Sequence, residues 1–229
     1  VEASSKIDHQ IVIVGREDEI NAELAKYNYD ESKIQVVHAS EVIENEDSPV
    51  KAIRRKTDSS MVKGLTMLKD GEGDLFISAG NTGAYMAGSL LILGRIPGVD
   101  RPAIASIYPI AGGALPSIIV DAGANSECRP SNLLEFAIMG SLYMEKVMDR
   151  KNASVGLVNL GIEENKGTTV TKAAHKLLKE ADINFIGNVE ARDVPKGACD
   201  VIVCDGFTGN LILKTYEGVA MVVMNEIKS

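Results

Sequence analysis

The chain has 229 residues, of which 45% are hydrophobic and 24% are charged, and its formal net charge is −8 at pH 7. A chain of this length and composition can bury a sizeable core, and we expect a single α/β domain over residues 1–229. The acidic balance repels nucleic acid unless basic residues gather on one face. Trp is absent, which removes the usual base-stacking platform. These properties argue against a nucleic-acid-binding function.

Cysteine and histidine usage argues against disulfides and metal. The three cysteines are odd in number and form no C-x-x-C pair, which fits a reducing cytosol. The three histidines are scattered and no H-E-x-x-H occurs, so we expect neither a metal site nor a cofactor. The longest apolar stretch, 83–94, is too short to span a bilayer. The chain begins without Met and stops inside a helical pattern, so we expect it to be incomplete at both ends.

In the first part of the chain, apolar runs alternate with helical patterns. The apolar runs predict strands at 11–15, 34–39 and 74–78. The helical patterns predict helices at 17–27, 48–69 and 83–94. Pro49 stands near the first turn of the second of these helices, where proline is tolerated, and Asp47 and Ser48 are the candidate caps.

The same alternation continues to the end of the chain. Strands are predicted at 103–109, 116–123, 154–159, 184–188 and 200–204, and helices at 131–148, 168–180 and from 210 onward. The connection at 110–115 is too short for a crossover helix, so it predicts an antiparallel strand pair near 103–121. Elsewhere the alternation predicts a mostly parallel sheet with helices on both faces.

Four loops that follow predicted strands are rich in polar and glycine residues: Ser78–Gly83, Asp121–Ser126, Asn159–Gly167 and Asp205–Asn210. In open α/β sheets, ligands bind outside the carboxyl ends of the strands, where loops lead into helices. We therefore expect these four loops to cluster around one site.

Two of the loops share one plan, in which an apolar strand leads through Gly-x-Thr-Gly into a helix. Glycine allows close backbone approach, and a helix start offers unpaired N–H groups and partial positive charge, so such a place suits phosphate. The simpler interpretation is a tight turn whose Thr or Asn caps the helix. Each turn alone favours that interpretation, whereas the two turns together with the 121–125 segment favour an anion site. The residues expected to bind substrate or phosphate are Gly80, Asn81, Thr82, Gly83, Asp121, Asn125, Asp205, Gly206, Thr208, Gly209 and Lys214.

Two further side chains are candidates for catalysis. Lys166 stands after a strand and just ahead of a helix, where it could place a cation over phosphate or a developing oxyanion, although a solvated loop lysine is the simpler interpretation. Asn210 could donate an N–H to a carbonyl oxygen or be only an early helical residue. Lys214 lies one helical turn further along and should share its face.

Other chemistries have weaker support. His175 stands at a helix position flanked by lysine, which predicts a surface or boundary side chain. Cys204 ends an apolar strand, which predicts a buried, inert thiol, and no Ser has the G-x-S-x-G context of a nucleophile. Neither G-x-G-x-x-G nor a Walker loop is present, so nucleotide binding is weakly supported.

Six stretches resemble one family. "SAGNTGA" (78–84), "RPAIASIYP" (101–109), "DAGAN" (121–125), "FAIMGSLYME" (136–145), "LGIEENKG" (160–167) and "CDGFTGNLILKTYEG" (204–218) together are similar to the bacterial phosphate acyltransferases of phospholipid synthesis, the PlsX family. The resemblance runs from about residue 34 to the end of the chain.

The resemblance implies transfer of a long-chain acyl group from acyl carrier protein to inorganic phosphate, without an acyl-enzyme intermediate. It implies a fold like that of isocitrate/isopropylmalate dehydrogenases and phosphate acetyltransferases. It also implies a cytoplasmic homodimer loosely attached to the membrane. By motif match, it assigns Lys166 and Asn210 to catalysis.

The chain departs from this family in places. Family members begin with a strand and an acidic, glycine-rich turn that this sequence lacks, and Thr57 stands where a basic residue is expected. Acyl carrier protein is acidic, so a chain of net charge −8 must bind it through a local basic patch. The candidate patches are Arg54-Arg55-Lys56, Arg95 with Arg101, and Arg150-Lys151.

Two other functions stay open at this point. One is a nicotinamide-dependent decarboxylating dehydrogenase on a related fold, which the missing dinucleotide motif disfavours. The other is a non-catalytic sensor of acyl chains or phosphate.

Overall fold

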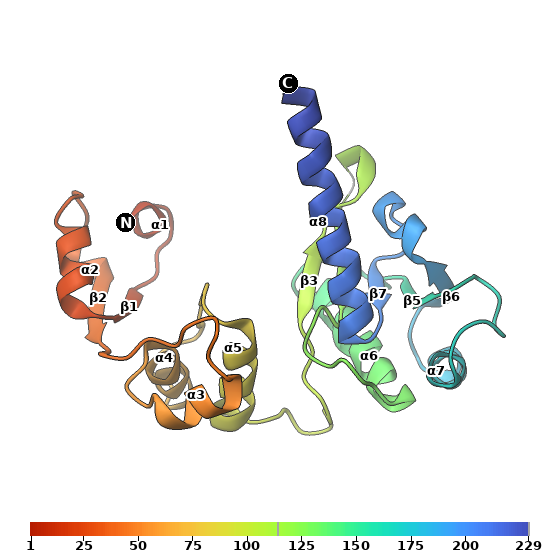
Figure 1. Cartoon of the computed structure of the whole chain (residues 1–229), viewed down its shortest axis with the longest axis horizontal. Helices are drawn as coiled ribbons and strands as arrows, with labels where there is room; N and C mark the ends of the chain where they lie inside the picture. The colour runs from red at the N-terminus through yellow and green to blue at the C-terminus, as the bar shows by residue number, and fades with distance from the viewer. Residues whose placement is uncertain (114, 229) are drawn as a thin grey trace. The chain divides into compact units, whose positions relative to one another are not determined.

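The computed structural model describes residues 1–113 and 115–228. The chain divides into two compact units, Val1–Ile96 and Pro97–Ser229, and each is described by itself. The expectation of one single domain stays a prediction. Figure 1 gives the labels of the helices and strands used below.

The first unit contains a parallel pair of strands, β1 (Ile11–Gly15) and β2 (Ile34–His38), with Ile11 opposite Ile34. The helix α2 (Glu17–Leu24) connects them, and the short helices α1 (Glu2–Lys6) and η1 (Glu31–Lys33) precede β1 and β2. Figure 1 shows β1 and β2 side by side, with α2 next to them. Both strands were predicted from their apolar runs, and both are confirmed.

The rest of this unit is helical: α3 (Pro49–Arg55), α4 (Ser60–Lys69), α5 (Thr82–Gly88) and η2 (Ser89–Leu93), a π-helical turn. Its core contains Ile53, Met61, Leu65 and Ala84. The prediction of one helix over 48–69 is wrong, because the chain leaves helical geometry at Lys56 and the Ser59 hydroxyl caps α4 by accepting from the Val62 N–H. Serine competes well for such a cap position, so the apolar pattern continues while the helix does not.

The predicted strand at 74–78 is also absent as a strand. Phe76 stacks on Tyr85 with ring centroids 5.7 Å apart, but its neighbours Leu75 and Ile77 are 77% and 82% exposed. A strand needs a hydrogen-bonding neighbour, and within the described residues none pairs with this segment.

The second unit is built on a five-stranded sheet in the order β3-β4-β7-β5-β6. The strands are β3 (Ala105–Tyr108), β4 (Ser117–Val120), β5 (Val155–Asn159), β6 (Phe185–Glu190) and β7 (Val201–Val203). β3 and β4 are antiparallel, with Ala105 opposite Val120, and every other pairing is parallel. The predicted antiparallel pair in a mostly parallel sheet is confirmed. The connection that predicted it includes Ala114, which lies outside the described residues.

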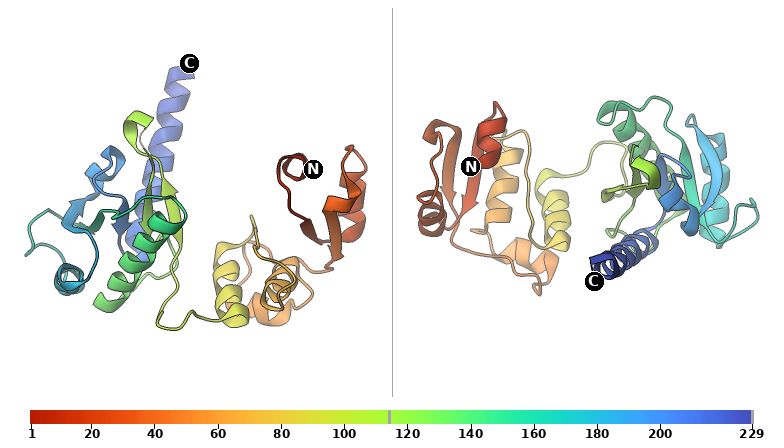
Figure 2. Two further views of the ribbon diagram at one scale, coloured as in Figure 1. Left: turned by 180° about the vertical axis from the view of Figure 1, so that it is seen from behind. Right: turned by 90° about the horizontal axis from the view of Figure 1, so that it is seen from above.

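Helices cover both faces of this sheet. Successive side chains of a strand point to opposite faces, so the contacts of neighbouring residues show which helix lies on which face. Val201 and Val203 pack with α6 (Pro130–Lys146) and α7 (Thr169–Glu180) on one face. Ile202, between them, packs with Tyr216 of α8 (Gly206–Lys228) on the other face. In Figures 1 and 2, α8 lies on one side of the sheet and α6 and α7 lie on the other. Two short 3-10 helices, η3 (Ala111–Gly113) and η4 (Ala191–Lys196), complete the unit.

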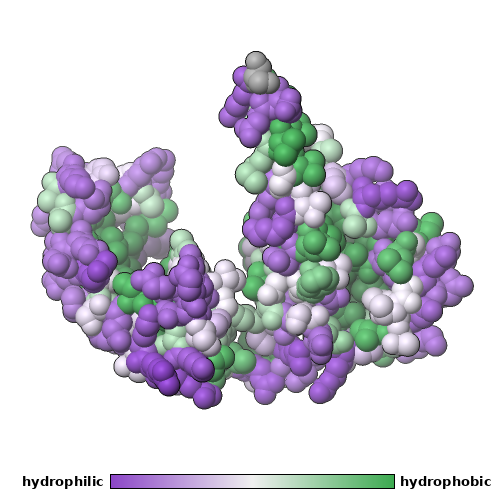
Figure 3. Space-filling view, in the orientation of Figure 1, coloured by the Kyte–Doolittle hydropathy of each residue, from purple (hydrophilic) through white to green (hydrophobic). Residues whose placement is uncertain are grey.

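The second half of α8 carries exposed apolar side chains, which Figure 3 shows along the helix. They are Val219, Met221, Val222, Val223, Met224 and Ile227. In the described part of the chain, no helix combines the length and the apolar character needed to cross a membrane.

Candidate functional site

Three of the four predicted loops leave one edge of the second unit's sheet. β4, β7 and β5 are parallel neighbours, so their carboxyl ends lie at the same edge. The loops at 121–126, 205–210 and 159–167 follow these ends directly. The fourth loop, Ser78–Gly83, belongs to the other unit, and its convergence with these three stays a prediction.

Asp121 organises the first of these loops. Its carboxylate is 0% exposed and accepts five hydrogen bonds. Oδ1 accepts from the backbone N–H groups of Ile104 (3.1 Å), Gly123 (3.2 Å) and Ala124 (3.0 Å). Oδ2 accepts from the N–H of Asn125 (2.7 Å) and from its side-chain amide (2.8 Å). The contact of Asp121 with phosphate stays a prediction. Both of its carboxylate oxygens accept hydrogen bonds within the protein.

Asn125 links this loop to the start of α8. Its carbonyl oxygen accepts from the N–H of Gly206 at 2.7 Å, and its side-chain amide also donates to the Pro102 carbonyl at 2.9 Å. A Cβ at position 206 would lie 2.7 Å from the Asn125 nitrogen. Glycine at 206 is therefore required by this close approach.

The first turn of α8 is capped by Asp205. Its carboxylate accepts from the Thr208 N–H at 2.8 Å and from the Thr208 hydroxyl at 3.0 Å, and its carbonyl accepts from the Gly209 N–H at 2.9 Å. The simpler interpretation of this turn, a capped helix start, is thus present. Within the described residues, the Phe207 N–H has no acceptor, so it is the backbone donor of this turn that is left for a ligand.

The matching turn in the first unit is capped in a similar way. The Asn81 side chain accepts from the Ala84 N–H at 2.9 Å, and its amide donates to the Glu44 and Asn45 carbonyls, each at 3.1 Å. Thr82 and Gly83 are exposed, and in the part of the chain that the structure describes their N–H groups have no acceptor. Gly80 donates its N–H to the Ser78 hydroxyl at 3.2 Å.

Lys166 projects from an exposed loop held at its base. The Asn159 amide donates to the Lys166 carbonyl at 3.1 Å, and the Asn188 amide donates to the Glu163 carbonyl at 2.9 Å. The ammonium of Lys166 forms no ion pair with any described residue, whereas Glu164 nearby pairs with Lys179 at 2.7 Å. Sequence reasoning missed Asn159 and Asn188, whose roles depend on contacts with a loop rather than on a motif.

Asn210 is exposed on α8 and lies beside Gly123, whose φ is 131°. A Cβ on Gly123 would stand 3.6 Å from the Asn210 side-chain oxygen. Lys214, one turn further along the helix, pairs with Glu217 at 2.7 Å, so its charge is already partnered. The structure therefore brings Asn210 against the 121–125 loop.

Cys204 and His175 are both buried in the second unit. Cys204 is buried and donates to the Asp121 carbonyl at 3.5 Å, and burial raises the pKa of its thiol well above the usual range. The expectation that this thiol is buried is confirmed, and its inertness stays a prediction. His175 is only 5% exposed and packs edge-on against Phe185, so the prediction of a surface or boundary side chain is wrong. The charged residues next to His175 in the sequence suggested an exposed position, but the His175 side chain faces the sheet.

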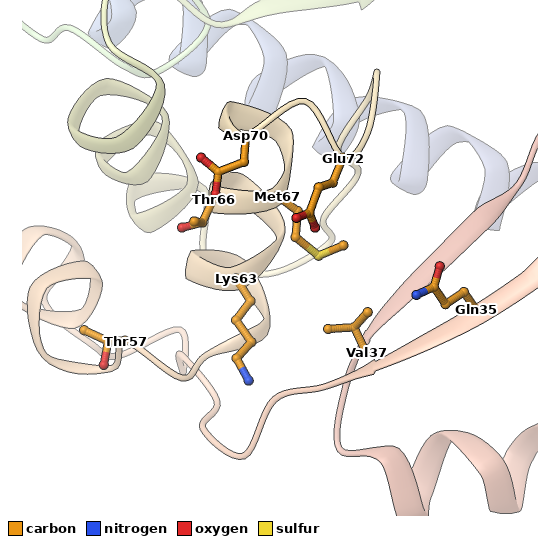
Figure 4. A pocket seen from close by; sticks show the side chains of 8 residues that line it. All are labelled: Gln35, Val37, Thr57, Lys63, Thr66, Met67, Asp70 and Glu72. Atoms are coloured by element: carbon orange, nitrogen blue, oxygen red, sulfur yellow. The ribbon is translucent and has the colours of Figure 1, made fainter.

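A pocket of about 400 Å³ lies in the first unit, between β2 and α4 (Figure 4). Its lining includes Gln35, Met67 and Glu72 and none of the predicted site residues. The ammonium of Lys63, which also lines it, is engaged by Asp58 and by the His38 carbonyl at 2.6 Å each. Among the described residues, no group of three or more His, Cys, Asp or Glu side chains could hold a metal ion.

The fold of the chain is that of the phosphotransacylases. It is similar to the crystal structure of a phosphotransacetylase from Streptococcus pyogenes, with a TM-score of 0.66, 16% identity, and coverage of 93% of this chain and 74% of that one. It is also similar to a branched-chain phosphotransacylase from Enterococcus faecalis V583, with a TM-score of 0.56, 13% identity, and coverage of 93% and 76%. At this identity the likeness shows the fold alone.

Sequence comparison then shows the family. The chain is 57% identical over 222 residues to a phosphate acyltransferase from Clostridium tetani (97% of this chain, 66% of the relative), and 57% identical over 228 residues to one from Alkaliphilus oremlandii (100% and 68%). The model of the fatty acid synthesis protein family matches residues 1–229, and the chain belongs to this family. It spans about two thirds of the length of these relatives.

Proposed function

We propose that the protein containing this chain is an acyltransferase that moves a long-chain acyl group from acyl carrier protein to inorganic phosphate, which supplies acyl phosphate for phospholipid synthesis. The observation that carries this proposal is the 57% identity to relatives named phosphate acyltransferase. The three polar loops at one sheet edge support it, because ligands of open α/β sheets bind at such an edge.

The proposed reaction is a direct displacement. A phosphate oxygen attacks the thioester carbonyl, a C–O bond to phosphate forms, and the C–S bond breaks with the electron pair leaving on the carrier's thiolate. Thiolate is a good leaving group, so strong acid catalysis is not required and positioning supplies much of the rate. The buried, protonated thiols support a mechanism without an acyl-enzyme intermediate.

Asn210 and Lys166 have the catalytic roles in this proposal. The exposed Asn210 amide donates to the oxyanion of the tetrahedral intermediate, an interaction worth about 3–4 kcal/mol per donor in other enzymes. Lys166, whose ammonium has no ion-pair partner within the described residues, attracts the phosphate. Within the second unit, the Phe207 N–H, which has no acceptor among the described residues, is the backbone donor that the first turn of α8 offers to phosphate. A contribution of the 80–83 turn to the same phosphate stays a prediction.

The acidic carrier protein is proposed to dock on α3. Of the predicted basic patches, Arg150 is paired with Asp200, Arg101 donates to the Glu127 carbonyl, and Lys56 pairs with Asp47 at 2.5 Å. Arg54 and Arg55 are exposed at the end of α3 and pair with no described carboxylate, so their charge is available to an acidic partner.

The family resemblance extends the proposal to assembly and place. We propose a homodimer in the cytoplasm whose subunits bury the exposed apolar side chains of the second half of α8. A loose contact with the cytoplasmic membrane face stays an expectation from the resemblance.

The deciding experiment is an assay of acyl phosphate formation from the acyl carrier protein thioester and phosphate. We expect Asn210→Ala to lower kcat by about 100-fold and Lys166→Ala mainly to raise the KM for phosphate. Lys176→Ala is the matched control, since it removes a different exposed lysine, one that lies on α7, and it should behave as wild type. Wild-type turnover in both site variants, with folding intact, would end the assignment. Binding of acyl chains or phosphate without turnover would favour a sensor, and NAD or NADP reduction would favour a dehydrogenase.

A further inference from the structure

The buried carboxylate of Asp121 lies between the end of β4 and the first turn of α8. We propose that Asp121 is a positioning residue: it fixes the 121–125 loop, and this loop holds the first turn of α8 so that Asn210 faces the reacting carbonyl. The kinetic part of this inference rests on the proposed function, because it assigns Asn210 to the oxyanion.

Asp121 fixes its loop through both oxygens. Oδ1 gathers the N–H groups of Gly123 and Ala124 and ties them to Ile104, which precedes β3. Oδ2 takes both donors of Asn125. The carboxylate is 0% exposed, and its five hydrogen bonds all come from N–H groups of the protein. It would also repel a bound anion, so we infer that it holds the loop in place and does not bind the anion itself.

The loop lies in close contact with the start of α8. The Asn125 carbonyl accepts the Gly206 N–H, and a Cβ at 206 would lie 2.9 Å from both the Ala124 nitrogen and Asp121 Oδ2. Gly123 stands against the Asn210 side chain. These contacts are close and lie mostly between main-chain atoms, so we expect a displacement of the loop to move Asn210 as well.

An isosteric replacement tests the carboxylate. In Asp121→Asn, one carboxylate oxygen is replaced by an amide NH2. Whichever oxygen it replaces, the NH2 faces N–H groups and has no acceptor there, because N–H groups surround both oxygens in the wild type. The loop must then open on one side. Asn125→Ala is the milder companion, since it removes one side-chain donor and keeps the backbone bond to Oδ2.

Asp200 provides a matched control at the opposite edge of the same sheet. Its carboxylate accepts from the Ser154 N–H at 2.7 Å and the Ser154 hydroxyl at 2.8 Å, and it pairs with Arg150. It precedes β7, whereas Asp121 follows β4. Asp200→Asn therefore damages a comparable polar cluster far along the strands from Asn210.

The kinetic arm uses the full chain and the acyl phosphate assay, corrected for the folded fraction. We expect Asp121→Asn to lower kcat by about 30- to 100-fold, as misplacements of about 1 Å do in other enzymes, and Asp200→Asn to change kcat by less than about 2-fold. Added to Asn210→Ala, Asp121→Asn should lower kcat by less than about 2-fold, because its effect passes through Asn210. A full, multiplicative loss in the double variant, or wild-type kcat in Asp121→Asn, overturns the inference.

The second arm needs no activity and separates this inference from the proposed function. Amide hydrogen exchange should accelerate by about 10-fold or more at Gly206–Asn210 in Asp121→Asn and, to a smaller extent, in Asn125→Ala, and stay unchanged there in Asp200→Asn. If wild-type protein forms no acyl phosphate, the proposed function fails while exchange still decides the positioning role. If Asp121→Asn does not fold, Asn125→Ala decides it in both arms. Unchanged exchange at this turn overturns the inference.

Discussion

Gly209 of α8 lies with its backbone directly against the main-chain carbonyl of Asp121. A Cβ at position 209 would overlap that oxygen and would also lie 3.0 Å from the Cys204 sulfur. Gly209 is therefore required because α8 lies so close to the 121–125 loop, which follows β4.

Gly209→Ala should destabilise the second unit by at least about 1–3 kcal/mol, because the added Cβ would overlap the Asp121 carbonyl oxygen, a main-chain atom that cannot rotate away as a side chain can. Gly218→Ala is the control in the same helix, since a Cβ there meets no atom within 4 Å. It should be neutral or stabilise by up to about 1 kcal/mol through helix propensity. Urea denaturation of both variants checks this prediction, and equal stabilities would contradict it.

The stability of the first unit should depend on pH through Asp58. Its carboxylate binds Lys63 and accepts from the Ser40 N–H (2.8 Å) and hydroxyl (2.6 Å). The hydrogen bond from Lys63, followed by those from Ser40, holds the pKa of this carboxyl well below its usual range. A lowered folded-state pKa contributes stability above the unfolded pKa of about 3.9, and that stability is lost as pH falls further.

Urea denaturation at pH 7, 5 and 3 measures this effect. Wild type should lose more stability than Asp58→Asn between pH 5 and pH 3, because the variant has no carboxylate to protonate at this position. The same loss in both proteins would mean that the Asp58 contacts add nothing to the stability of the unit.

The three thiols should react slowly with a disulfide reagent at pH 8 in the native protein. Burial raises the pKa of Cys128 to about 11 and that of Cys199 to about 12, and it raises the pKa of Cys204 well above the usual range, so little thiolate is present. Cys128 is the least buried and should react first, and Cys128→Ser should leave only the slow phase. Unfolding in urea should make all three react fast. Rapid native labelling of Cys204 with loss of acyl phosphate formation would instead indicate a nucleophile.

Charge reversal on α3 should weaken docking of the acidic carrier protein. We expect Arg54→Glu with Arg55→Glu to raise the KM for the acyl carrier protein thioester by about 10-fold and to leave kcat unchanged, since these residues are exposed and remote in sequence from the catalytic candidates. Lys172→Glu with Lys176→Glu on α7 makes the same change in net charge and is the control. Equal KM values in the two double variants would place the docking surface elsewhere.

Much of the second unit's fold could be predicted from local patterns. The short connection at 110–115 predicted the antiparallel pair, and the alternation of strands and helices predicted the parallel remainder. The pattern failed where the chain leaves helical geometry at Lys56 and Ser59 caps the start of a new helix, and where the apolar run at 74–78 has no strand to pair with among the described residues. Apolar periodicity records which side chains can be buried, but it does not record which hydrogen-bonding partner is available.

The sequence by itself determined the order of the elements, the direction of the strands and the family, because these depend on local periodicity, loop length and motif identity. Only the tertiary structure decided which polar groups are free for a ligand. The Asp121 carboxylate accepts from five donors, Gly206 donates its N–H to the Asn125 carbonyl, and the Phe207 N–H has no acceptor in the part of the chain that the structure describes. The bond from Gly206 joins residues about eighty positions apart, which the packing of α8 on the 121–125 loop brings together and no local pattern encodes.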